Sequence, residues 1–277
     1  MAGLNIVGVA SGSPLSQKAM TSIAATHRLA AIVVPSTLRP TGLRRWFGPE
    51  NRLADIRAPL ISVEEIAQYA PDLIVVASYP ARIPSVALAA ARLGGLNIHM
   101  SLLPRHRGSD PIFWTYFDDD PMAGVTVHWM NTEIDLGDIA AQQQIELERG
   151  RPSRDLYHEL ADKGVALLSD ALNCIAQGSA SRRQQTVEGA SYETARQIEA
   201  TRVPFGQWSA ERVWHVLSGL GDQRSGLIDS ADGHRLSHGR ATSFEMTAGI
   251  TPGNLERTSD GYRLHCADGF VSVCKRD

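Results

Sequence analysis

The sequence has little of what marks a secreted, metal-rich or membrane protein. Its three cysteines, Cys174, Cys266 and Cys274, are widely spaced and form no C-x-x-C pair. An odd number of dispersed cysteines argues against a disulfide scaffold and against a cysteine-rich zinc module. No apolar run reaches the ~18–20 residues of a membrane span, and the start of the chain lacks a basic segment followed by an apolar core. We therefore expect a cytoplasmic protein without a membrane partner.

The chain also lacks an excess of charge of either sign. Twenty-seven Lys and Arg residues are balanced by 30 Asp and Glu, which gives a formal net charge of -3. A general electrostatic attraction for nucleic acid is not expected from this balance. Hydrophobic residues make up 43% of the chain and charged residues 21%, so long disordered or coiled-coil regions are disfavoured. The length of 277 residues fits a main domain with an appendage.

Short apolar runs alternate with helical stretches through the first half of the chain. Such runs are typical of parallel strands that are covered on both faces by helices. The sequence therefore predicts an α/β, Rossmann-like domain with a mostly parallel sheet. Strands are expected at residues 4–10, 30–34, 73–77, 96–99, 124–130 and 139–147, and helices up to about residue 27 and over 83–92 and 154–176.

The C-terminal third has a different pattern. Residues 177–190 are polar and contain Gly and Ser, which is typical of a linker. A helix at 210–217 precedes short β segments that are separated by glycine-containing turns. This pattern predicts a small β-rich, OB-like domain. The expected division is a catalytic domain over residues 1–176, a linker over 177–190 and the small domain over 191–277.

The stretch from Asn97 to Gly108 reads N-I-H-M-S-L-L-P-R-H-R-G and has the clearest chemical pattern. Residues two apart on a strand point to the same face, so Asn97 and His99 share a face while Ile98 faces the packing helices. Both would lie at the C-terminal end of a parallel strand, where open α/β sheets bind ligands. An amide and an imidazole can each donate a hydrogen bond to a carbonyl oxygen that becomes negative. The alternative is a hydrogen-bonded histidine at a strand end beside a capping asparagine.

This stretch resembles the catalytic segment N-x-H-x-S-L-L-P-x-x-R-G of the formyltetrahydrofolate-dependent formyltransferases, and every fixed position matches. Residues 124–139 are similar to a second family element, a G-V-T strand followed by a D-x-G loop, with the aspartate at Asp135. The 38 residues between Asn97 and Asp135 also resemble the family's spacing. The resemblance covers residues 4–172, and the family includes enzymes that formylate methionyl-tRNA, glycinamide ribonucleotide and amino sugars.

The resemblance implies that a formyl group is moved from N10-formyltetrahydrofolate to an amine, with no metal. It implies that Asn97 and a protonated His99 stabilise the oxyanion, and that Asp135 keeps the imidazole charged and helps to move the ammonium proton. An ammonium is no nucleophile until a base deprotonates it, and a carboxylate beside an imidazole suits that task. The alternative for Asp135 is a turn residue at the Gly137 bend. His106 and His128 are expected to be bystanders.

The resemblance further implies that backbone groups of two loops, residues 77–83 and 131–134, hold the pterin ring. Leu102 is expected to shape an apolar wall. Ser101 could orient His99 or contact the folate, and a hydrogen bond from its hydroxyl to nearby backbone is equally open. Tyr79 is followed by proline where relatives often have glycine, so the geometry of the first loop is expected to differ. The expected folate-binding residues are Ser78, Tyr79, Ile83, Ser101, Leu102, Asn131, Glu133 and Ile134.

Two features bear on the acceptor. Residues 38–57 contain five arginines against two acidic residues, where tRNA-acting relatives carry a basic loop that would attract phosphates. The C-terminal residues 191–277 carry ten basic against eleven acidic residues, which suits a polyanion poorly. Trp114 resembles a residue of enzymes that formylate small amines, and Asp110 would suit an ammonium or hydroxyl group better than a phosphate. We expect both to bind substrate, although core packing is open for Trp114. We expect an amino-sugar nucleotide or an amino acid-derived amine such as hydroxyornithine, with methionyl-tRNA formylation as the alternative.

Other classes of protein fit the sequence less well. A catalytically silent folate-binding protein need not keep Asn97, His99 and Asp135 together. A formate-releasing hydrolase is disfavoured, because its relatives carry an N-terminal regulatory domain that we do not expect before Leu4. Gly8 and Gly12 do not form a G-x-G-x-x-G motif, so a nicotinamide site is not expected. The acidic run at 118–120 lacks the spaced oxygen ligands of a calcium loop.

Overall fold

The computed structural model describes residues 3–35, 53, 55–230 and 232–276. The chain forms two compact units that are each built from separate segments. The first unit comprises Met1–Gly108, Gly124–Gln144 and His158–Tyr192, and the second comprises Ser109–Ala123, Ile145–Tyr157 and Glu193–Asp277. This division differs from the expected boundaries at residues 176 and 191. Two segments from within the expected catalytic domain, Ser109–Ala123 and Ile145–Tyr157, belong to the second unit, because their side chains pack with its helices.

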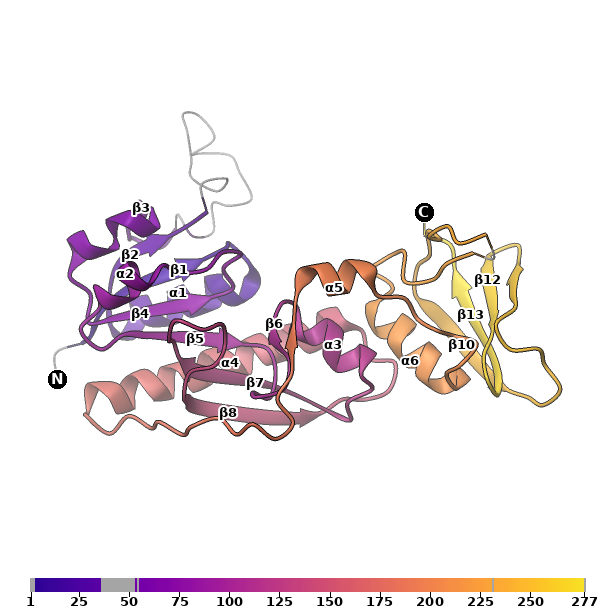
Figure 1. Cartoon of the computed structure of the whole chain (residues 1–277). Coiled ribbons are helices and arrows are strands. Elements are labelled where there is room, and N and C mark those ends of the chain that lie inside the picture. The colour runs from indigo at the N-terminus through magenta and orange to yellow at the C-terminus, as the bar shows by residue number, and fades with distance from the viewer. Residues whose placement is uncertain (1–2, 36–52, 54, 231, 277) are drawn as a thin grey trace, which may run out of the picture. The chain divides into compact units, whose positions relative to one another are not determined.

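The first unit is built on a seven-stranded sheet in the order β3-β2-β1-β4-β5-β7-β8 (Figure 1). The pairs β2–β3, β1–β2, β1–β4 and β4–β5 are parallel, and β7 runs antiparallel to β5. The predicted mostly parallel sheet is therefore confirmed. The strands are β1 (Asn5–Ala10), β2 (Arg28–Val33), β3 (Leu60–Ile61), β4 (Leu73–Ala77), β5 (Gly95–His99), β7 (Met122–Trp129) and β8 (Ile139–Glu146).

Successive residues of each strand point to opposite faces of this sheet, and helices pack on both faces. The helix α4 (Ser153–Ala176) approaches so closely at Gly164 that a Cβ there would lie 2.9 Å from side-chain carbons of Ile98 and Val125. Ile98 thus faces α4, and Asn97 and His99 point to the opposite face, as the spacing predicted. That face holds a core of β1, β2 and β4 side chains with Ile66, Ile83 and Ala87. The other helices are α1 (Pro14–Thr26), the 3-10 helix η4 (Val63–Tyr69) and α2 (Ser85–Ala89).

The second unit contains an open four-stranded antiparallel sheet, ordered β10-β13-β12-β11, with α6 (Ala210–Leu220) packed against β10 and β13. The predicted β-rich C-terminal region is confirmed. Its strands are β10 (Ala241–Met246), β11 (Leu255–Arg257), β12 (Gly261–His265) and β13 (Gly269–Cys274), and its other helices are α3 (Pro111–Phe117) and α5 (Ala195–Ala200). A separate two-stranded sheet joins β6 (Arg107–Gly108) and β9 (Tyr192–Glu193). No helix of the described residues is long and apolar enough to cross a membrane.

The core of the second unit contains a buried histidine. His215 of α6 is fully buried, its ring stacks on Tyr116 with centroids 5.1 Å apart, and its Nδ1 accepts a hydrogen bond of 2.9 Å from the Gly150 N–H. Accepting that bond requires an unprotonated Nδ1, and Nε2 has no partner among the described residues. Burial, together with the positive charge of Arg149, lowers the pKa of His215 to about 4.

We expect His215 to make the fold sensitive to acid. Between pH 6.5 and about 4 the unfolded chain binds a proton that the folded chain does not, so stability falls as the pH falls through this window. A difference of this size is worth about 3 kcal/mol at the acid end. The test is His215→Asn, whose side chain can still accept from the Gly150 N–H. Between pH 7 and pH 4 its free energy of unfolding, measured with urea, should fall by about 3 kcal/mol less than that of the unaltered protein. The exposed His234→Asn change is the control, and identical pH dependence in all three proteins would contradict this role.

Candidate active site

Asn97, His99 and Asp135 come together at the carboxyl end of β5. Asn97 Nδ2 donates to Asp135 Oδ1 at 3.3 Å, and His99 Nδ1 lies 3.5 Å from Asp135 Oδ2. The side chains of His99 and Asp135 are only 7% and 9% exposed. An amide and an imidazole on β5 and a carboxylate 38 positions after the amide thus form one cluster, as the family resemblance implied.

His128 belongs to the same cluster, contrary to its expected role as a bystander. It lies directly across the β5–β7 ladder from Asn97, its Nε2 is 3.0 Å from Asn97 Nδ2, and the same nitrogen is 3.3 Å from Asp135 Oδ1. Its Nδ1 lies 3.0 Å from the Trp129 carbonyl oxygen and donates to it, while its Nε2 faces both Asn97 Nδ2 and Asp135 Oδ1. The parity of His128 along its strand could have indicated this position, but only with the knowledge that β5 and β7 are neighbours.

The hydrogen bonds of His99 define its resting tautomer. Its Nε2 lies 2.7 Å from the His106 carbonyl oxygen and must donate to it, since a carbonyl cannot donate. Burial lowers the pKa of His99. The Asp135 carboxylate and the His106 carbonyl raise it, but the effect of burial is larger and the pKa lies below its ordinary value. The resting ring is therefore neutral at pH 7, with a free lone pair on Nδ1. This differs from the protonated His99 that the family resemblance implied, because the site is buried.

Asp135 remains ionised although it is buried. Burial raises its pKa, but the neighbouring His99 and His128 and the Gly108 N–H, which donates to Oδ2 at 2.8 Å, together hold the pKa well below its usual range. The cluster therefore combines a permanent carboxylate with a neutral imidazole. Such a pair can take up one proton on the imidazole and stabilise the cation that results.

The loop that carries Asp135 has a constrained backbone. Asp135 has φ of 54°, in the left-handed region that non-glycine residues rarely adopt. Two residues later, a Cβ on Gly137 would lie 1.7 Å from the Trp129 carbonyl oxygen, so the loop can only approach β7 this closely with glycine. This steric limit is the physical reason for a glycine two residues after the aspartate.

The two loops that were expected to hold the pterin are linked to each other. The Arg82 side chain, in the loop after β4, donates to the Thr132 carbonyl in the loop before Asp135. Ser78 has φ of 60° and receives a hydrogen bond of 3.1 Å from the Ser11 hydroxyl. Of the other residues expected to bind folate, Tyr79 is half-buried, Ile83 is part of the core, Glu133 is exposed, Ile134 is 42% exposed, and Asn131 Oδ1 accepts from the Glu133 N–H at 2.9 Å.

Ser101 and Leu102 are engaged within the protein. The Ser101 hydroxyl donates to the Arg105 carbonyl at 2.7 Å, which is the backbone alternative considered for this residue. Leu102 is half-buried and packs against Gly124, where a Cβ would lie 2.3 Å from its Cδ2. The structure thus gives both residues a role in fixing the turn after His99, and folate contact remains a prediction.

Asp110 and Trp114 are in the second unit. Asp110 is the N-cap of α3, where Oδ1 accepts from the Phe113 N–H at 3.3 Å and Oδ2 pairs with Arg224. Trp114 is buried and packs edge-on against Phe113 and Phe117. These contacts give Asp110 a capping role and Trp114 a core role, and substrate binding by them remains a prediction. Of the arginine-rich segment 38–57, the residues Arg39, Arg44, Arg45 and Arg52 lie outside the described residues.

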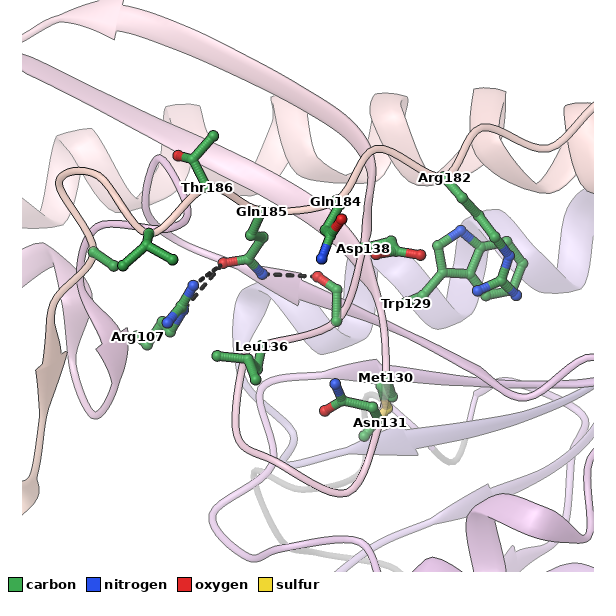
Figure 2. Close-up of a pocket in the computed structure, with 13 residues that line it drawn as sticks. Arg107, Trp129, Met130, Asn131, Leu136, Asp138, Arg182, Gln184, Gln185 and Thr186 are labelled. Carbon is green, nitrogen blue, oxygen red and sulfur yellow. Dashed lines mark hydrogen bonds between the residues drawn. The ribbon is translucent and has the colours of Figure 1, made fainter.

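A cavity of about 440 Å³ lies beside the Asp135 loop (Figure 2). Its walls are the end of β7, the loop residues Leu136 and Gly137, and the polar segment that follows α4. Arg107 and Gln185 both line this cavity, and hydrogen bonds join their side chains (Figure 2). The segment expected to be a linker therefore packs against the loop that carries Asp135.

The fold and the cluster define an α/β domain with an amide, an imidazole and a carboxylate at the carboxyl edge of its sheet. The family model described as formyl transferase matches residues 56–172. The chain is 25% identical over 256 residues to the methionyl-tRNA formyltransferase of Caldanaerobacter subterraneus subsp. tengcongensis, covering 88% of this chain and 82% of the relative. Residues 56–172 thus resemble the formyltransferase family in sequence, and most of the chain is similar to a methionyl-tRNA formyltransferase.

Two further proteins are similar to this chain, one in sequence and one in fold. The methionyl-tRNA formyltransferase of Methylacidiphilum infernorum is 34% identical over 183 residues, a match that covers 65% of this chain and 55% of that enzyme. The crystal structure of the N-formyltransferase from Helicobacter canadensis, in complex with folinic acid and dTDP-3-aminofucose, has a TM-score of 0.76 at 16% identity, and the match covers 100% of each chain. This structural likeness shows the shared fold.

The close approach at Gly137 can be tested with Gly137→Ala. The added Cβ has no space beside the Trp129 carbonyl, so the loop must shift or the fold must strain. Overpacking of this kind costs about 1–3 kcal/mol, which urea unfolding can measure. Leu136→Ala, at an exposed position of the same loop, is the control and should cost far less. Equal stability of Gly137→Ala and the unaltered protein would show that the loop is not held against β7.

Proposed function

We propose that this protein transfers a formyl group from N10-formyltetrahydrofolate to the amine of a small molecule. The observation that carries the proposal is the buried Asp135 carboxylate, which lies within 3.5 Å of both His99 and Asn97. A buried charge is costly unless its partners compensate for it, and proteins keep such groups where chemistry requires them. A silent binding protein would have no need of this arrangement.

His99 is the proton acceptor in this proposal. An amine arrives as an ammonium ion, and the lone pair on His99 Nδ1 takes a proton from it so that the nitrogen can attack the formyl carbon. The imidazolium that forms lies 3.5 Å from the Asp135 carboxylate, which stabilises it. The amine nitrogen gives up a second proton as its new bond to carbon forms. N10 takes up one proton when the N10–carbon bond breaks, and the other proton is released to solvent, which returns His99 to its neutral form.

Asn97 stabilises the formyl oxygen as it becomes negative. Its amide N–H groups point to His128 Nε2 and, at the longer distance of 3.3 Å, to Asp135 Oδ1. Exchange of the longer bond for the substrate oxygen directs one N–H at the developing charge, while His128 holds the amide by the other. Donors that are oriented before the reaction are worth more than donors that must first turn.

The loops beside the cluster fit a reduced folate. Arg82 ties the loop after β4 to the loop before Asp135, so both are held at the carboxyl edge of the sheet. Ile134 and Leu136 flank Asp135 in sequence and are partly exposed, at 42% and 38%, which suits contact with an apolar ring. Bound formyltetrahydrofolate supplies the formyl carbon, and the residues expected to hold it are those of the two loops.

We expect His99→Ala and Asp135→Asn each to lower kcat by about 100-fold or more, because each removes an oriented group that handles the proton or its charge. The measurement is tetrahydrofolate release with the preferred amine. His234→Ala and Asp162→Asn, at exposed positions, are matched controls for the same side-chain changes. Circular dichroism verifies folding, and turnover near normal in both active-site variants would remove the proposed mechanism.

The pH dependence of turnover tests which form of His99 is active. The neutral ring is required, so the rate should fall as the pH falls through the pKa of His99, which burial places below its ordinary value of 6.5. Asp135 raises that pKa, so the residual activity of Asp135→Asn should fall off at still lower pH. A rate that rises as the pH falls would instead identify the protonated ring as the active form.

A small amine is the proposed acceptor. The C-terminal residues 191–277 are nearly neutral, with ten basic and eleven acidic residues, which is weak for a surface that holds a polyanion. The whole-chain likeness to a structure that holds an aminofucose nucleotide supports an amino-sugar nucleotide as the first candidate. Methionyl-tRNA is the second candidate, because two relatives in sequence carry that activity in their names.

A panel of acceptors separates these candidates. Tetrahydrofolate release is measured with amino-sugar nucleotides, with hydroxyornithine and with charged initiator tRNA. We expect turnover with a small amine and no binding to tRNA at physiological salt. If tRNA were the substrate, affinity would fall by about 0.9 log units per log unit of salt for each neutralised phosphate on a duplex, and Arg44→Ala with Arg45→Ala would flatten that slope. Micromolar, salt-sensitive tRNA binding with formylation would overturn the small-amine assignment.

A further inference from the structure

Gln185 makes an unusually complete set of hydrogen bonds from the segment that follows α4. Its Nε2 donates to the Asp135 carbonyl and to the Gly137 carbonyl, both at 2.7 Å. Its Oε1 accepts from Arg107 Nε at 3.0 Å and from Arg107 Nη2 at 2.7 Å. Figure 2 shows the amide between Arg107 on one side and the Asp135 loop on the other.

This set uses the full capacity of the amide. A glutamine side chain has two N–H donors and one oxygen with two lone pairs. Both donors are directed at carbonyl oxygens and the oxygen is directed at a guanidinium, so a flipped amide would place oxygen against oxygen and nitrogen against nitrogen. The side chain therefore has one orientation that satisfies its partners, and the polar segment 177–190 is fixed at this point.

The groups that Gln185 binds are those that hold Asp135. Its two carbonyl partners belong to Asp135 itself, where φ is 54°, and to Gly137. Its guanidinium partner, Arg107, directly precedes Gly108, whose N–H donates to the Asp135 carboxylate at 2.8 Å. One side chain thus connects the backbone that carries the carboxylate with the backbone that receives its hydrogen bond.

We infer that Gln185 is a positioning residue, which fixes the Asp135 carboxylate against His99 by linking the Asp135 loop to Arg107. The inference rests on the proposed function in one respect, namely that the placement of Asp135 sets the rate of formyl transfer. The hydrogen bonds from Gln185 hold Asp135 in its unfavourable left-handed backbone conformation. Loss of Gln185 lets the loop relax and moves the carboxylate. A shift of about 1 Å in a reacting group can lower a rate by about 100-fold.

The main test uses Gln185→Met, which keeps the side-chain length and removes all four hydrogen bonds. We expect kcat to fall by about 10- to 100-fold while KM for each substrate changes by less than about threefold. The reason is that Gln185 binds the backbone of the Asp135 loop and acts through Asp135. Gln184→Met, in the same segment and lining the same cavity, is the matched control and should leave both constants unchanged. A change in KM alone would assign Gln185 to substrate binding and overturn the inference.

A second readout does not depend on activity. The ring of His99 is titrated by NMR in the unliganded protein, with its signals assigned from His99→Gln. Asp135 raises the pKa of His99, so displacement of the carboxylate in Gln185→Met should lower that pKa, since His106, His128 and Arg107 are the same residues in this variant and in the unaltered protein. Unchanged His99 titration and unchanged kcat in Gln185→Met would overturn the inference.

Two more variants keep the test decisive if Gln185→Met is unstable. Gln185→Glu still accepts from Arg107 but has no N–H for the two carbonyls, and we expect it to lose kcat as Gln185→Met does. Arg107→Met leaves the two carbonyl bonds in place and should lose less. If the unaltered protein forms no formyl product with any amine, the proposed function fails, and the titration of His99 still decides the role of Gln185.

Discussion

The structure of the site depends on one constraint, which is that a carboxylate buried in the protein must be surrounded by partners that compensate for its lost hydration. Asp135 receives these partners from three separate parts of the chain. They are Asn97 on β5, His128 on β7 and the N–H of Gly108, which follows the turn after His99. Each partner also fixes the position of the carboxylate relative to His99. The same contacts that permit burial therefore define the chemistry, and the neutral state of His99 follows from the same lack of water.

The sheet order explains how these parts meet. The antiparallel pairing of β5 with β7 places His128 opposite Asn97 and Thr126 opposite His99. The Thr126 hydroxyl donates to the Ser101 carbonyl at 2.6 Å, and thereby holds the turn that leads to Gly108. The chain then returns from β7 through the Asp135 loop, where Gly137 permits contact with the Trp129 carbonyl. The position of the carboxylate thus depends on strand register, one hydroxyl and one glycine.

The sequence was sufficient to predict the parallel sheet and the shared face of Asn97 and His99, because strand patterns and strand parity are local properties. Asp135 as their partner came from the family resemblance of the motifs and their spacing. His128 and Gln185 could not be found in this way. The role of His128 depends on which strand lies beside β5, and an antiparallel neighbour inserted into a parallel sheet has no local sequence signal. Gln185 lies in a polar segment without periodicity, so its hydrogen bonds depend on tertiary contact alone. The two-unit division was missed for the same reason, since residues 109–123 and 145–157 pack with residues distant in sequence.

The cluster of Asn97, His99 and Asp135 contacts only the reacting groups in the proposed mechanism, which bears on how an acceptor amine is chosen. In the proposed mechanism the carboxylate and the neutral imidazole accept a proton from any ammonium ion, so the cluster would require an amine without selecting one amine over another. Acceptor choice must then reside in groups that recognise the remainder of the acceptor molecule. For tRNA these would have to be many cations, because affinity for a polyanion grows with each neutralised phosphate. The near balance of charge over residues 191–277 contrasts with the segment 38–57, where five arginines outnumber two acidic residues in the sequence, so this segment concentrates positive charge that would attract the phosphates of an acceptor.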